Sequence, residues 1–336
     1  MALPFKACKD VKSDYSHGQQ VNELSIFNKP SVVIYRATPS QKGRIAAFLV
    51  KSGRSTLSIG DGNNDVAMLK DSHVGVGIMG KEGTQAALSA DFAIPQFRNL
   101  KNLILIHGRY SFLRYTKIAL NSYYKNIVFI VAQFMYNLYS GASASPLYNS
   151  FTLNYYNLFF TSMIPFSVVL FDRDVTPSFA LNQPSSYRHI RNHFDKIFIV
   201  LNIFFAVFEA LVVFFGIRLL TLNDITNGSG ILGAYASIST IFSIIVIYTV
   251  VLRQIRQISY RVFFTDIAIA LTIILNIVSI FVIQELYNRS NYTIYYLLSM
   301  PYFYFICICL CTLIYSADTV FENVCLYLED RLKMKN

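Results

Sequence analysis

The stretch that decides the fold runs from Ser58 to Met68 and reads SIGDGNNDVAM. It overlaps a short apolar run, Thr56 to Ile59, that is typical of a buried strand. Two glycines then allow the backbone to turn sharply at the end of the strand. Parallel α/β folds bind their ligands at the carboxyl ends of their strands, where Asp61 and Asp65 would lie. Carboxylates suit Mg2+, so this turn predicts a magnesium and phosphate site.

Strand and helix patterns alternate on both sides of this turn. Upstream, the apolar run Val32 to Tyr35 predicts a strand, and RATPSQK, from Arg36 to Lys42, predicts a turn that opens a helix. Downstream, Val74 to Ile78 predicts a strand, Gly83 to Ala90 a helix, and Asp91 to Ile94 another strand. The alternation indicates a doubly wound α/β layer built on a partial parallel sheet.

The remainder of the chain is strongly apolar. The hydrophobic fraction of the 336 residues is 54% and the mean hydropathy is +0.42, and the apolar excess lies after Ile118. A membrane helix needs about 20 mainly apolar residues. Segments of this kind predict six membrane helices at 118–139, 153–171, 197–220, 231–252, 262–283 and 294–315. We therefore expect an integral multi-pass membrane protein in which an all-α domain follows the α/β unit.

Basic residues are distributed unequally between the loops. If the α/β unit is cytoplasmic, the alternation of helices makes 173–196, 253–261 and the tail after Ser316 cytoplasmic as well. These segments are rich in Lys and Arg, whereas the opposite loops hold Arg289, with Arg218 near a helix end. The bias obeys the positive-inside rule. It accounts for the net charge of +10, and we expect no nucleic-acid partner.

The first expected span contains a lysine. Lys125, followed by Asn126, lies roughly two turns inside the span. A charge at such a depth is costly enough to indicate a function. The structural alternative is a lysine whose ammonium reaches the membrane interface while its stem packs on apolar neighbours.

The second expected span offers neutral polar groups. Asn157, Thr161 and Ser162 carry amide and hydroxyl groups, and Pro165 frees a backbone carbonyl. No acidic residue occurs in these two spans before Asp172, which argues against cation transport because a cation needs carboxylates to replace its water shell. A lysine with amides and hydroxyls suits a phosphate or a zwitterionic head group better.

In their order and spacing, the strands and turns resemble the phosphorylation domain of P-type ATPases, which belong to the haloacid-dehalogenase-like superfamily. The membrane helices resemble those of the type IV P-type ATPases, the phospholipid flippases. The resemblance runs from about Leu24 to the last helix and is dense to Tyr187. The segments that carry it are Thr38 to Lys42, His73 to Gly77, Glu82-Gly83, Asp91 to Ile94, Tyr124 to Ile127, Tyr156-Asn157, Phe160 to Ser162, Phe171 to Val175, Gln183-Pro184 and Tyr187.

This resemblance implies roles for individual residues. Lys42 would contact the phosphoryl group on a catalytic aspartate, and Asp61 and Asp65 would bind Mg2+. Asn64, with Asp65, would complete the polar shell around the phosphate. The implied phospholipid-binding residues are Lys125, Asn126, Asn157, Thr161 and Ser162.

The resemblance also implies a larger enzyme. Such an enzyme forms an aspartyl phosphate from ATP and Mg2+, moves a phospholipid from the outer to the cytoplasmic leaflet, and usually works with a two-span glycoprotein subunit. We assign residues 24–106 to the C-terminal part of a cytoplasmic phosphorylation domain, 107–117 to a stalk helix, 118–316 to the membrane domain and 317–336 to a cytoplasmic tail, with 1–23 unassigned.

The sequence departs from the family in one decisive motif. The phosphorylated aspartate of P-type ATPases lies in Asp-Lys-Thr-Gly, which does not occur in these 336 residues, so we expect no activity from them alone. Ile164 replaces the first of the two prolines that the family carries in the second span, so the kink there would depend on Pro165 alone. Two alternatives stay open: a non-catalytic, truncated paralogue that binds lipid or a partner, and a fragment of a cation-transporting P-type ATPase.

Overall fold

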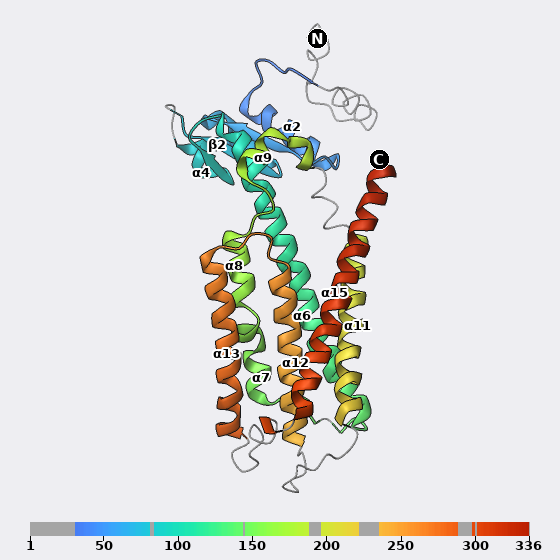
Figure 1. Cartoon of the computed structure of the whole chain (residues 1–336). Coiled ribbons are helices and arrows are strands. Elements are labelled where there is room, and N and C mark those ends of the chain that lie inside the picture. The colour runs from blue at the N-terminus through green and yellow to red at the C-terminus, as the bar shows by residue number, and fades with distance from the viewer. Residues whose placement is uncertain are drawn as a thin grey trace. The chain divides into compact units, whose positions relative to one another are not determined.

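A computed structural model of the chain describes residues 31–80, 84–143, 145–187, 196–221, 235–287, 298–299 and 301–335 (Figure 1). The chain divides into two compact units, residues 1–103 and 104–336. The first contains all the strands of the described residues, and the second is helical.

The first unit is built on a three-stranded parallel sheet. Its strands are β1 (Leu57–Gly60), β2 (Val74–Ile78) and β3 (Phe92–Ile94), in the order β1-β2-β3. The register places Val76 beside Ile59 on one side and beside Phe92 on the other. Val76 is completely buried, so the centre of β2 is the core of this unit.

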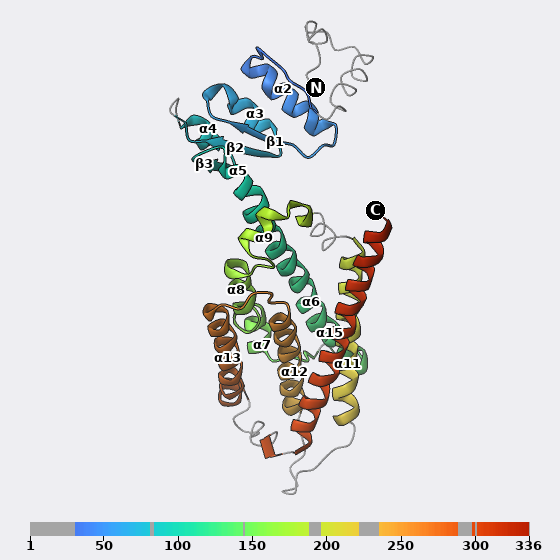
Figure 2. The ribbon, with the colours of Figure 1, turned by 45° about the horizontal axis from the view of Figure 1, so that its top comes forward.

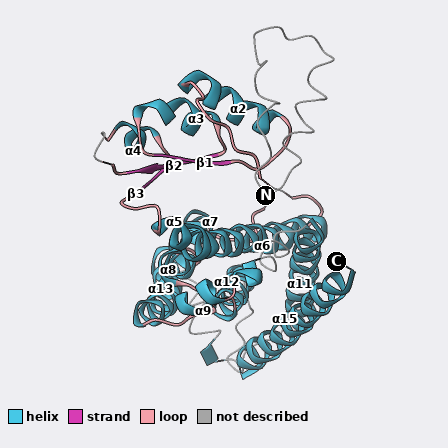
Figure 3. Ribbon diagram, turned by 90° about the horizontal axis from the view of Figure 1, so that it is seen from above, coloured by secondary structure: helices cyan, strands magenta, loops and turns pink. Residues whose placement is uncertain are grey.

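Helices α2 (Pro39–Lys51), α3 (Val66–Asp71) and α4 (Gln85–Ser89) lie on one face of the sheet (Figure 3), and the short α5 (Asn99–Asn102) follows β3. α3 connects β1 to β2, and α4 connects β2 to β3. Each crossover in a parallel sheet is right-handed, so successive crossovers in one direction place their helices on one face. The expected parallel α/β architecture is confirmed.

The two expected strands upstream of the turn had different outcomes. The strand expected at Thr56 to Ile59 forms as β1, one residue later. It was expected to be buried, but Leu57 is exposed because β1 is an edge strand among the described residues. The strand expected at Val32 to Tyr35 is wrong: the segment is described as irregular, and its apolar side chains are exposed. Apolar composition alone does not make a strand, because a strand needs a neighbour to pair with its backbone.

The second unit is a bundle of helices (Figure 2). A π-helical turn, η2 (Leu103–Gly108), leads into it. The elements that follow are α6 (Arg109–Tyr139), α7 (Ser150–Tyr155), η3 (Tyr156–Phe160), α8 (Met163–Phe171), α9 (Pro177–Asn182), η4 (Pro184–Ser186), α11 (Lys196–Thr221), α12 (Tyr235–Arg256), α13 (Phe263–Tyr287) and α15 (Pro301–Lys335).

Four of these helices are long and apolar enough to cross a membrane: 196–219, 238–256, 263–283 and 303–324, within α11, α12, α13 and α15. The first expected span, 118–139, lies inside the unbroken α6, which is less apolar. The second, 153–171, is divided among α7, η3 and α8. The multi-pass membrane assignment is supported, and the count of six spans stays a prediction.

α12 lies at the centre of the bundle. It contacts α6, α8, α11, α13 and α15. Of its apolar stretch 72% is buried, against 22% for α13, which shows that α12 faces protein and α13 faces outward. Polar side chains on α12 therefore have to find partners on neighbouring helices, because a bilayer core supplies none.

We predict that Gly77→Ala destabilises the α/β unit. A Cβ at Gly77 in β2 would lie 2.6 Å from the Cα of Ala87 and 2.7 Å from the carbonyl oxygen of Ala86. Both are backbone atoms of α4, so the helix has to shift, at a cost of about 1–3 kcal/mol. Urea unfolding of the purified chain measures the effect. Leu88→Ala, on the exposed side of α4, is the matched control, and equal unfolding midpoints for the two variants would contradict the close packing.

Candidate functional site

The turn after β1 gathers acidic and amide side chains. β1 ends at Gly60, and a single 3-10 turn, η1 (Asn63–Asp65), leads into α3. A Cβ on Gly60 would lie 2.4 Å from the Cβ of Asp65, so only glycine lets the strand end approach Asp65 so closely. Asp61 and Asn64 are exposed, whereas Asp65 is half-buried.

α2 positions Lys42 at this turn. The helix begins at Pro39 after its N-cap Thr38, and Thr38 and Gln41 satisfy each other's backbone N–H groups in a capping box. Lys42 follows, and its Nζ donates to Oδ1 of Asp65 at 2.7 Å. The structure therefore brings together two of the residues that the sequence assigned to one site. Their roles there stay predictions.

The groups at this turn fit a Mg2+ ion. Mg2+ keeps several waters and is usually held by one or two carboxylates together with phosphate oxygens. Asp61 is exposed and forms no ion pair within the described residues, whereas Asp65 is paired with Lys42. In the described part of the chain, no group of three or more His, Cys, Asp or Glu side chains is placed to hold a metal ion by itself. Two carboxylates in a turn suit an ion shared with a phosphate, not an ion enclosed by protein.

The break in the second expected span leaves a carbonyl without its helical donor. Pro165 in α8 has no N–H, so the carbonyl of Thr161, four residues earlier, cannot be bonded within the helix. Gln254 of α12 donates its Nε2 to this carbonyl at 3.0 Å. The break coincides with the π-helical η3, a feature often found at functional sites. The sequence indicated the freed carbonyl but not its partner.

Lys125 of α6 lies beside this break. Its Nζ donates to Oγ1 of Thr161 at 3.2 Å, and the Thr161 hydroxyl donates to the carbonyl of Tyr156 at 2.8 Å. The Tyr156 hydroxyl donates in turn to the backbone carbonyl of Lys125, also at 2.8 Å. None of the ion pairs among the described residues involves Lys125. A half-buried ammonium is thus held by a neutral hydroxyl, and no carboxylate in the described part of the chain compensates its charge.

The other expected lipid-binding residues lie apart from this contact. Asn126 and Asn157 are exposed on the bundle surface. Ser162 donates its hydroxyl to the carbonyl of Leu158 in its own segment. The structure therefore joins Lys125 to Thr161 by a hydrogen bond and shows no hydrogen bond that would join the other three to them.

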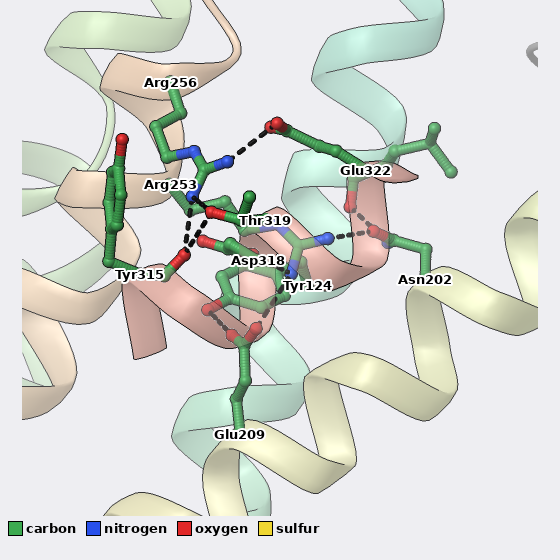
Figure 4. Close-up of polar contacts among 10 residues, drawn as sticks. Tyr124, Asn202, Glu209, Arg253, Arg256, Tyr315, Asp318, Thr319 and Glu322 are labelled. Atoms are coloured by element: carbon green, nitrogen blue, oxygen red, sulfur yellow. Dashed lines mark hydrogen bonds and ion pairs between the residues drawn. The ribbon is translucent and has the colours of Figure 1, made fainter. Parts of the chain in front are cut away.

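A second polar cluster lies inside the bundle (Figure 4) and centres on the guanidinium of Arg253. Nη2 donates to Oδ1 of Asn202 at 2.7 Å. Nη1 lies 3.2 Å from Oδ1 of Asp318 and 3.6 Å from Oε1 of Glu209. The guanidinium carbon is 3.9 Å from the ring centre of Tyr124, whose hydroxyl donates to Glu209. We call these five residues the Arg253 cluster.

The Arg253 cluster corrects one expectation about where the fourth span ends. Arg253 was expected in a cytoplasmic loop, but α12 continues to Arg256 and Arg253 is only 3% exposed. The prediction ended the span at the first charged residue, although partners on other helices neutralise that charge. Glu209, in the middle of the third expected span, accepts a hydrogen bond from Tyr124 of α6. Asp318 was not singled out in the sequence, where it follows the last apolar run.

Asp172 joins three segments at one end of the helical unit. Its side chain is 2% exposed, and Oδ2 accepts a hydrogen bond from Nζ of Lys117 at 2.6 Å. Oδ1 accepts from the backbone N–H groups of Ser259 and Tyr260 at 3.0 and 2.8 Å. The loops after α8 and after α12 therefore meet the start of α6 at the same end. The side of the membrane on which this end lies stays a prediction.

The fold and these sites define an integral membrane protein that carries a parallel α/β unit before its helices. Residues 87–329 match the family model described as phospholipid-translocating P-type ATPase, C-terminal. The chain therefore belongs to the type IV P-type ATPase family.

Relatives from three organisms, two animals and a plant, are described as phospholipid-transporting ATPases. Phospholipid-transporting ATPase IH of Mus musculus is 33% identical over 75% of this chain. Phospholipid-transporting ATPase 10 of Arabidopsis thaliana is 43% identical over 47% of it, and phospholipid-transporting ATPase IC of Xenopus tropicalis is 36% identical over 58%. The matches cover 22%, 13% and 16% of those relatives, so the chain spans about a fifth of their length or less.

We predict that Asp172→Asn destabilises the helical unit by about 3 kcal/mol, because losing one partner of a buried ion pair leaves Lys117 uncompensated. Thermal unfolding in detergent measures the loss. Asp266→Asn, which changes an exposed carboxylate in the first turn of α13, is the matched control and should leave the midpoint unchanged. A midpoint for Asp172→Asn within error of the control would show that Asp172 does not hold these segments together.

Proposed function

We propose that this chain forms the carboxyl-terminal part of an ATP-driven phospholipid flippase, which moves phospholipid from the outer to the cytoplasmic leaflet through an aspartyl-phosphate cycle. The family membership supports a transport ATPase of the P type. In this proposal the α/β unit is cytoplasmic, the substrate is a phospholipid, and a two-span glycoprotein is the accessory subunit. The absence of Asp-Lys-Thr-Gly from the 336 residues means that the nucleophile would come from sequence outside them.

The observation that carries this proposal is the environment of Lys125. Its ammonium contacts the Thr161 hydroxyl at 3.2 Å and has no ion-pair partner among the described residues. An intramembrane charge of this kind is expensive unless a ligand or a function compensates it. A phosphate group of a lipid supplies the opposite charge and several hydrogen-bond acceptors.

The Arg253 cluster argues against the cation-pump alternative. Glu209 and Asp318 are carboxylates inside the bundle, but both lie within ion-pair distance of Arg253. A transported cation would have to displace the guanidinium in order to use them. The truncated-paralogue alternative differs from the leading proposal only in whether a nucleophile acts on the same site.

In the proposed enzyme the turn after β1 holds the phosphate. Lys42 neutralises a phosphoryl oxygen, and its present partner Asp65, 2.7 Å away, keeps the ammonium in place. Asp61 and Asp65 would hold Mg2+, and the side-chain amide of Asn64 would form a hydrogen bond at the edge of the same turn. When bound, Mg2+ would stabilise negative charge that develops on the phosphoryl oxygens.

A first test concerns Asp61. In the full-length transporter, Asp61→Asn is expected to lower ATP turnover by about 100-fold or more, because losing a charged group at the phosphoryl site weakens electrostatic stabilisation of the transition state. ATP hydrolysis at millimolar Mg2+ measures it. Asp71→Asn, another exposed carboxylate of the same unit, is the control. Unchanged turnover for Asp61→Asn would identify Asp61 as an ordinary turn residue.

A second test concerns Lys125. Lys125→Ala is expected to raise the lipid concentration needed for half-maximal dephosphorylation by about tenfold or more, because a hydrogen bond to a charged group contributes about 1.5–3 kcal/mol. Phosphorylation by ATP should be nearly unchanged. A lysine that only reaches the membrane interface predicts the reverse pattern, with lower thermal stability and an unaltered lipid dependence. Superimposable lipid titrations of wild type and variant would therefore refute the transport role.

A further inference from the structure

Two consecutive residues of α12 contact two different polar sites. Gln254 donates to the Thr161 carbonyl at 3.0 Å, next to Lys125. Arg253, one residue earlier, is the centre of the Arg253 cluster. Consecutive residues of an α-helix point about 100° apart, so one short segment of α12 reaches both sites from two faces.

α6 repeats this arrangement. Lys125 donates to the Thr161 hydroxyl, whereas Tyr124, one residue earlier, donates its hydroxyl to Glu209 and lies under the Arg253 guanidinium. Figure 4 shows Tyr124 and Glu209 converging on Arg253 from their separate helices. The pairs Tyr124-Lys125 and Arg253-Gln254 therefore form a closed ring of contacts with Thr161 on one side and Glu209 on the other.

The Arg253 side of this ring is the rigid side. Glu209 is 0% exposed, and Arg253 and Asp318 are 3% and 4% exposed. Charges buried this deeply need each partner in place, because an unpaired one is strongly unfavourable. Asn202 connects Arg253 to the backbone of α6, because its Nδ2 donates to the carbonyl of Leu120 at 3.0 Å. Charge pairing thus holds α12 to α11 and α15, and the contacts of Tyr124 and of the Leu120 carbonyl tie α6 to the same group.

The Lys125 side of the ring is less constrained. It consists of single hydrogen bonds from Lys125 and from Gln254 to Thr161, with no ion pair among these three residues. Lys125 is only partly buried. The position of the Lys125 ammonium relative to the Thr161 hydroxyl therefore depends on how the Arg253 cluster holds α6 and α12.

We propose that Tyr124, Glu209, Arg253 and Gln254 are positioning residues for the phospholipid site at Lys125 and Thr161. This inference rests on the proposed function. It adds the residues that position Lys125 and Thr161 and thereby influence lipid affinity. Gln254 holds the Thr161 carbonyl, and the Arg253 cluster holds α6 and α12 at the spacing that brings Lys125 to the Thr161 hydroxyl. None of the four has to touch the lipid.

The test uses the full-length transporter in detergent micelles, with phosphatidylcholine, phosphatidylethanolamine and phosphatidylserine each titrated separately. The variants Gln254→Leu and Tyr124→Phe each remove one hydrogen bond without leaving a charge unpaired, so both are expected to fold. Glu209→Gln removes a charge that pairs with Arg253, so it is expected to shift the lipid titration further than the other two variants. Thr249→Val is the matched control, because Thr249 is buried in α12 but bonds only to the carbonyl of Ile245 in its own helix.

We expect Gln254→Leu and Tyr124→Phe to raise the lipid concentration for half-maximal dephosphorylation about threefold to tenfold. The rate at saturating lipid and the phosphorylation by ATP should stay close to those of wild type and of Thr249→Val. A purely structural role would instead lower the melting temperature and leave the lipid titration unchanged, which would overturn the inference. If Lys125→Ala shifts the titration but neither variant does, the proposed function stands and the positioning role fails. If wild type shows no lipid-dependent dephosphorylation with any of the three lipids, the proposed function fails and this role with it.

Discussion

A guanidinium enclosed by membrane helices has to be neutralised by protein groups, and this requirement organises the helical unit. Arg253 lies on the central helix α12 and draws Glu209, Asp318 and Asn202 toward it from α11 and α15, with Tyr124 of α6 beneath it. Apolar packing between such helices is weakly directional, since lipid tails are as apolar as leucine. Hydrogen bonds and ion pairs to one charged side chain are directional, so they select one arrangement of four helices among many that would bury similar area.

The α/β unit depends on a different constraint, the close approach of backbones. Parallel strands place their carboxyl ends at one edge of the sheet. At this edge the missing side chain of Gly60 allows Asp65 to pack against the end of β1. The capping box at Thr38 then fixes where α2 begins and therefore where Lys42 points. The two units thus build their polar sites in opposite ways: one from short-range turn chemistry, the other from side chains distant in sequence.

That contrast explains how far the sequence could predict the structure. Asp61 and Asp65 could be proposed as site residues because a turn is a local pattern, and Lys42 was assigned to the same site by resemblance. The structure brings Lys42 and Asp65 together, and the roles of all three stay predictions. Gln254 was missed because nothing near it in sequence indicates that Thr161, in another helix, needs a donor. Arg253 was misplaced because hydropathy treats each charge as solvated and cannot register a partner such as Glu209 from another helix. The irregular segment at Val32 to Tyr35 shows the same limit for strands, whose formation depends on a neighbour.

The adjacency of Tyr124 with Lys125, and of Arg253 with Gln254, restricts how this protein can vary through evolution. Inserting or deleting one residue within α6 or α12 turns the rest of the helix by about 100° and exchanges the faces that these pairs present. Side-chain replacement cannot repair such a rotation, because both faces are engaged at once. Length changes between related sequences should therefore be confined to the segments that join the helices, while α6 and α12 diverge by substitution at constant length.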